Sequence, residues 1–193
     1  MVLVYIHGAG ATKNSFNYLR ANLSEYKDTC FEYDIQDGFK HNLEVMSAKM
    51  KRHKDIFFIA HSMGGMYALH LADMFPNKVL GAVTISTPFG GAEIADYAKY
   101  IFPHYRLLRD IGTISRPVLR CKEILVSHPW TQIITTSGSS PWINKANDGV
   151  VTVESQKQHS GMEYVELKHT HFEVVLSPTT VTIIKDRISR VVS

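Results

Sequence analysis

The chain has 193 residues, of which 45% are hydrophobic and 20% are charged, and its formal net charge is +3. This length is enough for one domain with a core of its own, and the mild charge, with Lys and Arg scattered, argues against a nucleic-acid-binding protein. No apolar run is long enough to cross a bilayer, and two cysteines, Cys30 and Cys121, are too few for a disulfide framework.

Short apolar runs alternate with segments of helical periodicity along the chain, which is typical of βα units around a parallel sheet. Several runs are unbroken stretches of Val, Ile and Phe, as expected for strands that helices cover on both faces. We therefore predict an α/β fold with about six mostly parallel strands flanked by helices. The predicted strands are Val2–Ile6, Thr29–Asp34, Ile56–Ala60, Val79–Ser86, Thr131–Thr135 and Glu163–Leu167.

Apolar residues at helical spacing predict the helices between these strands. The first helix is expected to be capped by Asn14 or Ser15, the third to end before Pro76, and the last to begin at Ser177-Pro178. Their apolar stripes are Phe16, Leu19, Leu23 and Tyr26; Leu43, Met46 and Met50; Met63, Tyr67, Leu71 and Met74; and Val181, Ile184, Ile188 and Val191.

Residues 88–127 fit this alternation poorly, because they are rich in aromatic side chains and broken by prolines. Two interpretations remain open: an ordinary connection of helix and loop, or a cap or lid over the mouth of a site. We predict no second domain, so residues 1–193 form a single domain with this possible insertion.

The stretch FFIAHSMGG, residues 57–65, ends an apolar strand on Ser62. In an open parallel sheet, ligands bind beyond the carboxyl ends of the strands. A sharp turn at this place lifts the serine hydroxyl clear of the sheet and puts it at the N-terminus of the following helix. Such a turn requires small residues two positions before and two positions after the serine. Ala60 and Gly64 satisfy that requirement. An ordinary strand-to-helix turn is the alternative, since the pattern alone is weak.

The first strand ends in His7-Gly8-Ala9-Gly10, a turn that allows close approach of the backbone to a ligand. Neither glycine-rich phosphate-binding motif is present. The backbone N–H groups of Ala9 and Met63 are therefore predicted as donors to an oxyanion, and His7 as a structural hydrogen-bonding residue.

A carboxylate and a histidine follow later in the chain. Asp148-Gly149 comes after the fifth strand, in a place that suits either a common Asp-Gly turn or a carboxylate that orients a histidine. Asp96 and Asp110 also lie between the serine and the last histidines, but neither is on a loop after a strand.

The last strand is followed by His169 and His171. We select His171 as the base because the apolar FEVVL stretch behind it anchors it. The alternatives are His169 and a zinc site on the His-x-His pair, which lacks further ligands at suitable spacing.

With AHSMGG, HGAG, STPFGG and NDGVV in this order, the sequence resembles the α/β-hydrolase superfamily, and in particular the small single-domain bacterial lipases and esterases. The resemblance covers nearly the whole chain outside residues 95–125 and implies the minimal form of the α/β-hydrolase fold. It implies Ser62 as nucleophile, His171 as base and Asp148 as acid, with Ala9 and Met63 as oxyanion donors. Ala60 departs from the commoner glycine, as it does in some minimal lipases.

The activity that the resemblance implies is hydrolysis of carboxylic esters through an acyl-enzyme, on a small-molecule ester or a lipid. An acyltransferase or thioesterase on the same fold, and a catalytically inactive binding protein, are the alternatives. No cofactor or metal is predicted. The chain opens on VLVYIHG without a leader peptide, so we expect a cytoplasmic protein, although a trimmed secreted form would look the same.

Overall fold

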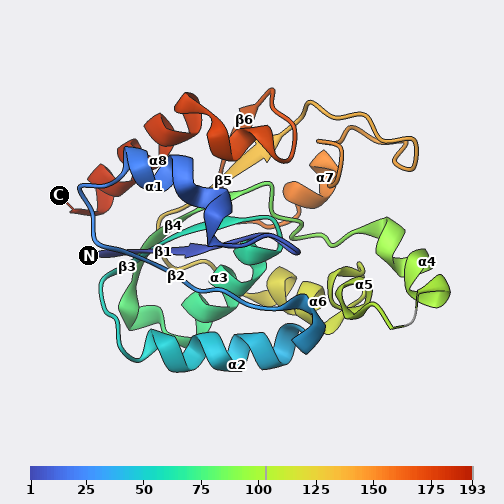
Figure 1. Ribbon diagram of the computed structural model, residues 1–193, viewed down its shortest axis with the longest axis horizontal. Coiled ribbons are helices and arrows are strands. Elements are labelled where there is room, and N and C mark those ends of the chain that lie inside the picture. The colour runs from blue at the N-terminus through green and yellow to red at the C-terminus, as the bar shows by residue number, and fades with distance from the viewer. Residues whose placement is uncertain (103, 193) are drawn as a thin grey trace.

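A single parallel sheet organises the computed structural model, which describes residues 1–102 and 104–192 (Figure 1). Position 103 of the segment 88–127, and the last residue of the predicted 1–193 domain, lie outside the described part. Within that part the sheet has six strands in the order β2-β1-β3-β4-β5-β6, and all neighbouring pairs are parallel. The predicted fold class is thus confirmed. The strands are β1 Val2–Ile6, β2 Asp28–Cys30, β3 Ile56–His61, β4 Val79–Ile85, β5 Trp130–Thr135 and β6 Glu163–Leu167.

The largest disagreement with the predicted strands is at β2, which was expected at Thr29–Asp34. The ladder with β1 ends after the Phe31 N–H donates to the Tyr5 carbonyl. The Asp34 side chain then accepts from the Gln36 N–H and starts a 3-10 turn at Ile35–Asp37. A side chain that hydrogen-bonds to the neighbouring backbone competes with sheet pairing, so the strand ends earlier than predicted.

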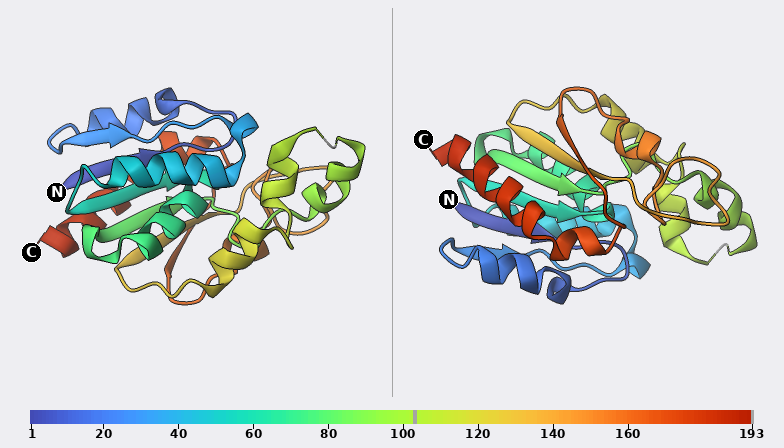
Figure 2. Two further views of the ribbon diagram at one scale, coloured as in Figure 1. Left: turned by 90° about the horizontal axis from the view of Figure 1, so that it is seen from below. Right: turned by 90° about the horizontal axis from the view of Figure 1, so that it is seen from above.

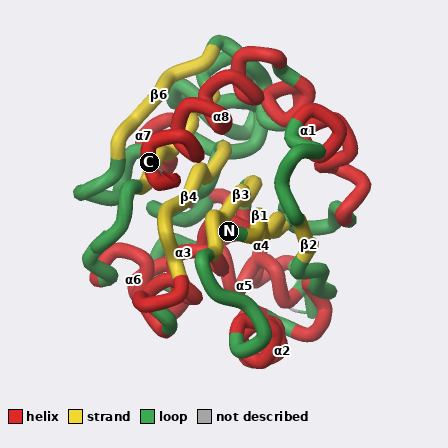
Figure 3. Tube along the Cα trace, turned by 90° about the vertical axis from the view of Figure 1, so that its left-hand side faces the viewer, coloured by secondary structure: helices red, strands yellow, loops and turns green. Residues whose placement is uncertain are grey.

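Helices cover both faces of the sheet. Helices α1 and α8 lie on one face, and α2, α3 and α6 on the other (Figures 1 and 3). The first predicted helix starts differently from expectation: Thr12 caps a 3-10 turn at Lys13–Phe16, and α1 follows it. The helices are α1 Asn17–Asn22, α2 Phe39–Met50, α3 Met63–Met74, α4 Glu93–Ile101, α5 Arg106–Ile111, α6 Arg116–Glu123, α7 Val153–Gln156 and α8 Pro178–Val192.

The two faces carry two separate cores because side chains alternate along each strand. In β3, Phe58 points into the core shared with α2, α3 and α6, whereas Phe57 and Ile59 point into the core shared with α1 and α8. All six residues of β3 are buried. This explains why the strand reads as a continuous apolar run.

The carboxyl ends of the strands meet at the edge of the sheet away from both chain termini, and α4 and α5 project beyond that edge (Figures 1 and 2). These two helices, with α6, form the segment 88–127. Among the described residues, no helix combines the length and apolar character needed to span a membrane. The edge beneath α4 is where the candidate site lies.

Candidate active site

Ser62 occupies the turn between β3 and α3 in a backbone conformation that is rare for a residue with a side chain, with φ 53° and ψ −129°. Such a conformation costs about 1–3 kcal/mol and persists only where the surroundings enforce it. Here the Ser62 N–H donates to the Ile85 carbonyl at 2.8 Å, and the Ser62 carbonyl accepts from Gly65 at 2.9 Å. The N–H and the carbonyl of Ser62 are therefore both held by hydrogen bonds, and the turn sets the direction in which the half-buried hydroxyl points.

The glycines around this turn are required by packing. A Cβ on Gly64 would lie 2.1 Å from the Ile6 carbonyl oxygen, and a Cβ on Gly8 would lie 3.1 Å from the Cβ of Ser62. Helix α3 can start directly against β1 only because position 64 has no side chain. Ala60, where the related motif has glycine, is fully buried between β1 and β4.

Ala9 and Met63 line the same pocket as Ser62. Met63 is the first residue of α3, so its N–H has no acceptor within the helix and lies at the positive end of the helix dipole. Ala9 follows the end of β1 in a half-buried turn. The arrangement is suited to binding an oxygen that gains negative charge.

His171 and Asp148 form a buried pair. The distance from His171 Nδ1 to Asp148 Oδ2 is 2.7 Å, and the His171 backbone N–H donates to the Asp148 carbonyl at 3.0 Å. The two residues are 2% and 1% exposed. Because a carboxylate only accepts hydrogen bonds, a neutral His171 ring carries its proton on Nδ1 and has its lone pair on Nε2.

Asp148 is surrounded by further donors. Its Oδ1 accepts from the backbone N–H groups of Val150 at 3.0 Å and Val151 at 2.7 Å, and its Oδ2 accepts from Thr135 Oγ1 at 2.5 Å. Burial by itself raises the pKa of this carboxyl, but the hydrogen bond and the charge of His171, with the Thr135 and Val151 donors, bring its pKa below the ordinary value. The carboxylate is therefore held ionised behind the imidazole.

Thr135 and Gln156 support Asp148 and were not identified from the sequence. Gln156, in α7, donates from Nε2 to Asp148 Oδ2 at 3.3 Å and to the Thr135 carbonyl at 3.1 Å, and its Oε1 accepts from the Thr135 N–H at 2.9 Å. Thr135 is the last residue of β5, and the sequence already placed the end of this strand at the edge of the sheet where ligands bind, so this position could have identified it. Nothing in the sequence around Gln156 indicates its role.

His61 is a third residue that sequence reasoning missed, although it lies within the AHSMGG motif. The distance from its Nε2 to the His171 carbonyl oxygen is 2.9 Å. Burial, followed by the proximity of His171, lowers the pKa of His61 to about 3. The ring is therefore neutral, and because the carbonyl only accepts, Nε2 is the donor. His61 anchors the loop that carries His171.

The alternative residues considered from the sequence have other partners. His169 Nε2 lies 2.9 Å from Ser177 Oγ, outside the pocket that contains Ser62. The Asp96 carboxylate accepts from Thr113, and the Asp110 carboxylate accepts from the Phe39 N–H. Of the three aspartates, Asp148 is the one that contacts a histidine of this loop.

A pocket of about 270 Å³, called here the Ser62 pocket, brings the predicted site residues together: Ser62, His171, Ala9 and Met63 all line it. Ser62 and His171 share this pocket, and among the described residues their side chains form no hydrogen bond with each other. Hydrogen bonds of this kind are often long before substrate binds. The segment 88–127 contributes Pro88, Ala92, Ile94, Leu107 and Ile111 to the lining.

Comparisons with known proteins agree with this fold. Residues 38–111 match the family model described as alpha/beta hydrolase fold. A stretch of 70 residues is 40% identical to Triacylglycerol lipase 2 of Saccharomyces cerevisiae; it covers 35% of this chain and only 21% of the yeast protein.

Solved structures are similar over almost the whole chain. A metagenomic carboxyl esterase superposes with a TM-score of 0.76 at 16% identity, covering 98% of this chain and 74% of the esterase. The monoacylglycerol lipase of Paleococcus ferrophilus gives a TM-score of 0.71 at 13% identity, covering 97% and 94% of the two chains. At these identities the likeness shows a shared fold.

Proposed function

We propose that this chain, an α/β-hydrolase by its fold and by the family match over residues 38–111, hydrolyses carboxylic esters with Ser62 as nucleophile, His171 as general base and Asp148 as the orienting acid. The observation that carries the proposal is the buried 2.7 Å contact between His171 Nδ1 and Asp148 Oδ2, on the rim of a pocket that also contains Ser62. The lipase and esterase relatives support ester hydrolysis as the reaction type.

The reaction would proceed in two halves. Ser62 Oγ attacks the ester carbonyl carbon while His171 Nε2 takes the hydroxyl proton, and the carbonyl oxygen becomes an oxyanion that the N–H groups of Ala9 and Met63 can stabilise. The C–O bond then breaks, and His171 returns the proton to the departing alcohol oxygen. Water then attacks the acyl carbon while His171 takes one of its protons. The bond from the acyl carbon to Ser62 Oγ breaks, His171 returns the proton to Ser62 Oγ, and the acid is released.

Asp148 has two effects on this cycle. It keeps the proton of the neutral imidazole on Nδ1, so that Nε2 faces the serine, and it stabilises the imidazolium that forms when His171 takes a proton. The donors from Thr135, Gln156, Val150 and Val151 keep the carboxylate in one orientation. We also propose that the segment 88–127 covers the pocket, because it supplies five of its lining residues.

Labelling with a fluorophosphonate, combined with ester turnover, tests the assignment. The reagent should modify Ser62 and abolish hydrolysis of p-nitrophenyl butyrate. Ser62→Ala should remain folded, resist labelling and lose activity by about a thousandfold or more. Near-normal turnover by this variant, or labelling at another residue, would refute the site. Product analysis with an added alcohol or amine acceptor separates hydrolysis from acyl transfer.

A further inference from the structure

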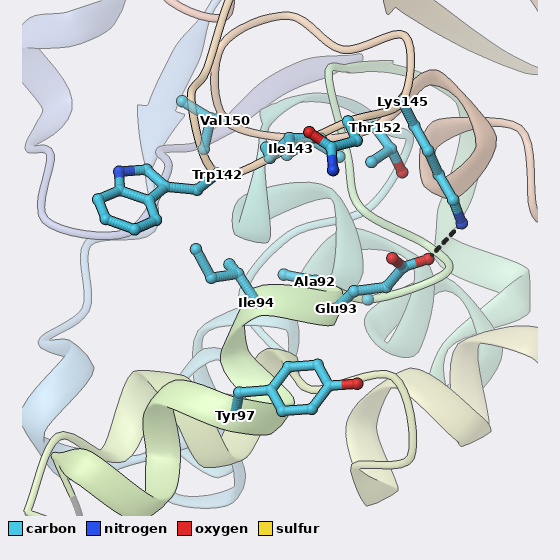
Figure 4. Close-up of a pocket in the computed structure, with 12 residues that line it drawn as sticks. Ala92, Glu93, Ile94, Tyr97, Trp142, Ile143, Lys145, Val150 and Thr152 are labelled. Carbon is cyan, nitrogen blue, oxygen red and sulfur yellow. Dashed lines mark hydrogen bonds and ion pairs between the residues drawn. The ribbon is translucent and has the colours of Figure 1, made fainter.

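A second cavity adjoins the Ser62 pocket. The Trp142 cavity, as we call it, has a volume of about 260 Å³ and is lined by residues 91–94, 97, 142–145 and 150–152, all of which are described (Figure 4). It shares Ala92, Ile94, Val150 and Val151 with the Ser62 pocket. The two spaces are therefore neighbours that have these four lining residues in common.

Two of the shared residues lie on the side of the candidate base. Val150 and Val151 follow Asp148 in the chain, and their N–H groups donate to Asp148 Oδ1, the carboxylate that holds His171. In acyl transfer the leaving oxygen must face the imidazole that protonates it, whereas the carbonyl oxygen faces the opposite donors. The group attached to the leaving oxygen is therefore directed toward the His171 side of the Ser62 pocket, where Val150 and Val151 also line the Trp142 cavity.

We infer that the Trp142 cavity binds the alcohol portion of the ester, with Trp142 as a specificity-determining residue, while the Ser62 pocket holds the acyl portion. This inference rests on the proposed function. Trp142 is 79% exposed, yet its side chain lines the cavity together with Ile94 and Val150. An indole at such a position gains apolar contact when an alkyl group binds beside it.

The cavity has an apolar end and a polar end. Figure 4 places Trp142, Val150 and Ile94 toward one side and the ion pair of Lys145 with Glu93 toward the other. Lys145 Nζ lies 2.6 Å from Glu93 Oε1 and 2.9 Å from Glu154 Oε2. Because this ammonium is already paired with two carboxylates, the polar end suits a neutral hydroxyl rather than an anionic group.

The volume limits the size of the alcohol. A cavity of about 150 Å³ holds benzene, so the Trp142 cavity has room for about ten non-hydrogen atoms. The expected substrate class is an ester whose alcohol portion is a medium-length alkyl group, preferably ending in a hydroxyl. The apolar length lies along Trp142 and the terminal hydroxyl reaches Lys145 and Glu93.

Two series of esters test the assignment in the full chain. The alcohol series compares ethyl butyrate, hexyl butyrate and 6-hydroxyhexyl butyrate, and the acyl series compares ethyl butyrate with ethyl octanoate. In Trp142→Ala, the ratio of kcat/KM for hexyl to ethyl butyrate should fall about fivefold, with the acyl ratio unchanged. Leu107 lines the Ser62 pocket but not the Trp142 cavity. In Leu107→Ala, the kcat/KM ratio of the acyl series should therefore change, and that of the alcohol series should not.

Lys145→Met tests the polar end, because it should lower the ratio for 6-hydroxyhexyl to hexyl butyrate about threefold. Tyr100→Ala is the matched control: Tyr100 is as exposed as Trp142 and lines neither space. Both ratios should stay at their wild-type values in this variant.

The outcomes separate the two proposals. If ethyl butyrate is hydrolysed and Ser62 is labelled by a fluorophosphonate, but Trp142→Ala leaves the alcohol ratio unchanged or alters the acyl ratio instead, the inference is wrong while the proposed function stands. If the wild-type protein neither hydrolyses any of the esters nor reacts with the fluorophosphonate, the proposed function is wrong, and the inference that rests on it is overturned as well.

Discussion

Replacing His61 with glutamine removes an imidazole that the fold keeps neutral, while the side-chain amide retains a donor for the His171 carbonyl. In the wild-type chain the native imidazole is fully buried, and its pKa is lowered to about 3, first by burial and then by the nearby His171. In the unfolded chain a histidine has a pKa of about 6.5. Between these two values the unfolded chain binds a proton that the native protein does not.

The sign and size of the effect follow from this difference. Stability from neutral His61 is fully present above about pH 6.5 and is lost as the pH falls toward 3, because protonation then favours the unfolded state. At pH 5 the loss relative to pH 8 is about 2 kcal/mol, from 1.5 pH units at 1.36 kcal/mol each. His7 and His70, whose pKa values burial also lowers, change stability in the same direction in both proteins and cancel in the comparison.

Urea unfolding of the wild type and His61→Gln at pH 5, 6, 7 and 8 measures the effect. The free-energy difference between the two proteins should shift by about 2 kcal/mol in favour of the variant between pH 8 and pH 5. His41→Gln, at an exposed position of α2, controls for loss of an imidazole and should follow the wild type. If the free energy of unfolding depended on pH in the same way in the wild type and in His61→Gln, His61 would not be held neutral in the native state. The argument for its hydrogen bond to the His171 carbonyl would then fail.

Two further substitutions test the site and its support. Asp148→Asn should lower kcat by about 10³–10⁴-fold with little change in KM, because an amide no longer holds the His171 proton on Nδ1; steady-state kinetics on p-nitrophenyl butyrate check this, and a decrease below tenfold would contradict the assigned role. Gly64→Ala should destabilise the protein by about 3 kcal/mol or more, since its Cβ would lie 2.1 Å from the Ile6 carbonyl oxygen; thermal unfolding measures it, and a wild-type Tm would show that β1 and α3 are not packed as described.

The local pattern of the sequence was enough to predict much of the fold. β1 and β6 begin and end at the predicted residues, and α3 ends before Pro76 as expected. These elements follow from apolar runs, helical spacing and helix-ending residues, which act within a few positions of the chain. The strand β2 was misplaced because the hydrogen bond that the Asp34 side chain accepts from the Gln36 N–H favours a turn over a longer strand.

The contacts that the site residues make were harder to predict than the strands and helices. The sequence offered three aspartates and two histidines and favoured Asp148 and His171 by their loops, but the 2.7 Å distance between the two comes only from the tertiary structure. The supports from His61, Thr135 and Gln156 depend on contacts between residues far apart in the chain, with 110 positions between His61 and the carbonyl of His171.

The sequence by itself determined the order of strands and helices and the serine at a strand-to-helix turn, because periodicity and turn chemistry are local properties. The tertiary structure alone decided how closely Asp148 and His171 approach each other, that His61 is buried and neutral, and that a second cavity shares Val150 and Val151 with the Ser62 pocket. Burial and distance between remote residues arise when the helices close over the sheet, and no window of the sequence contains them.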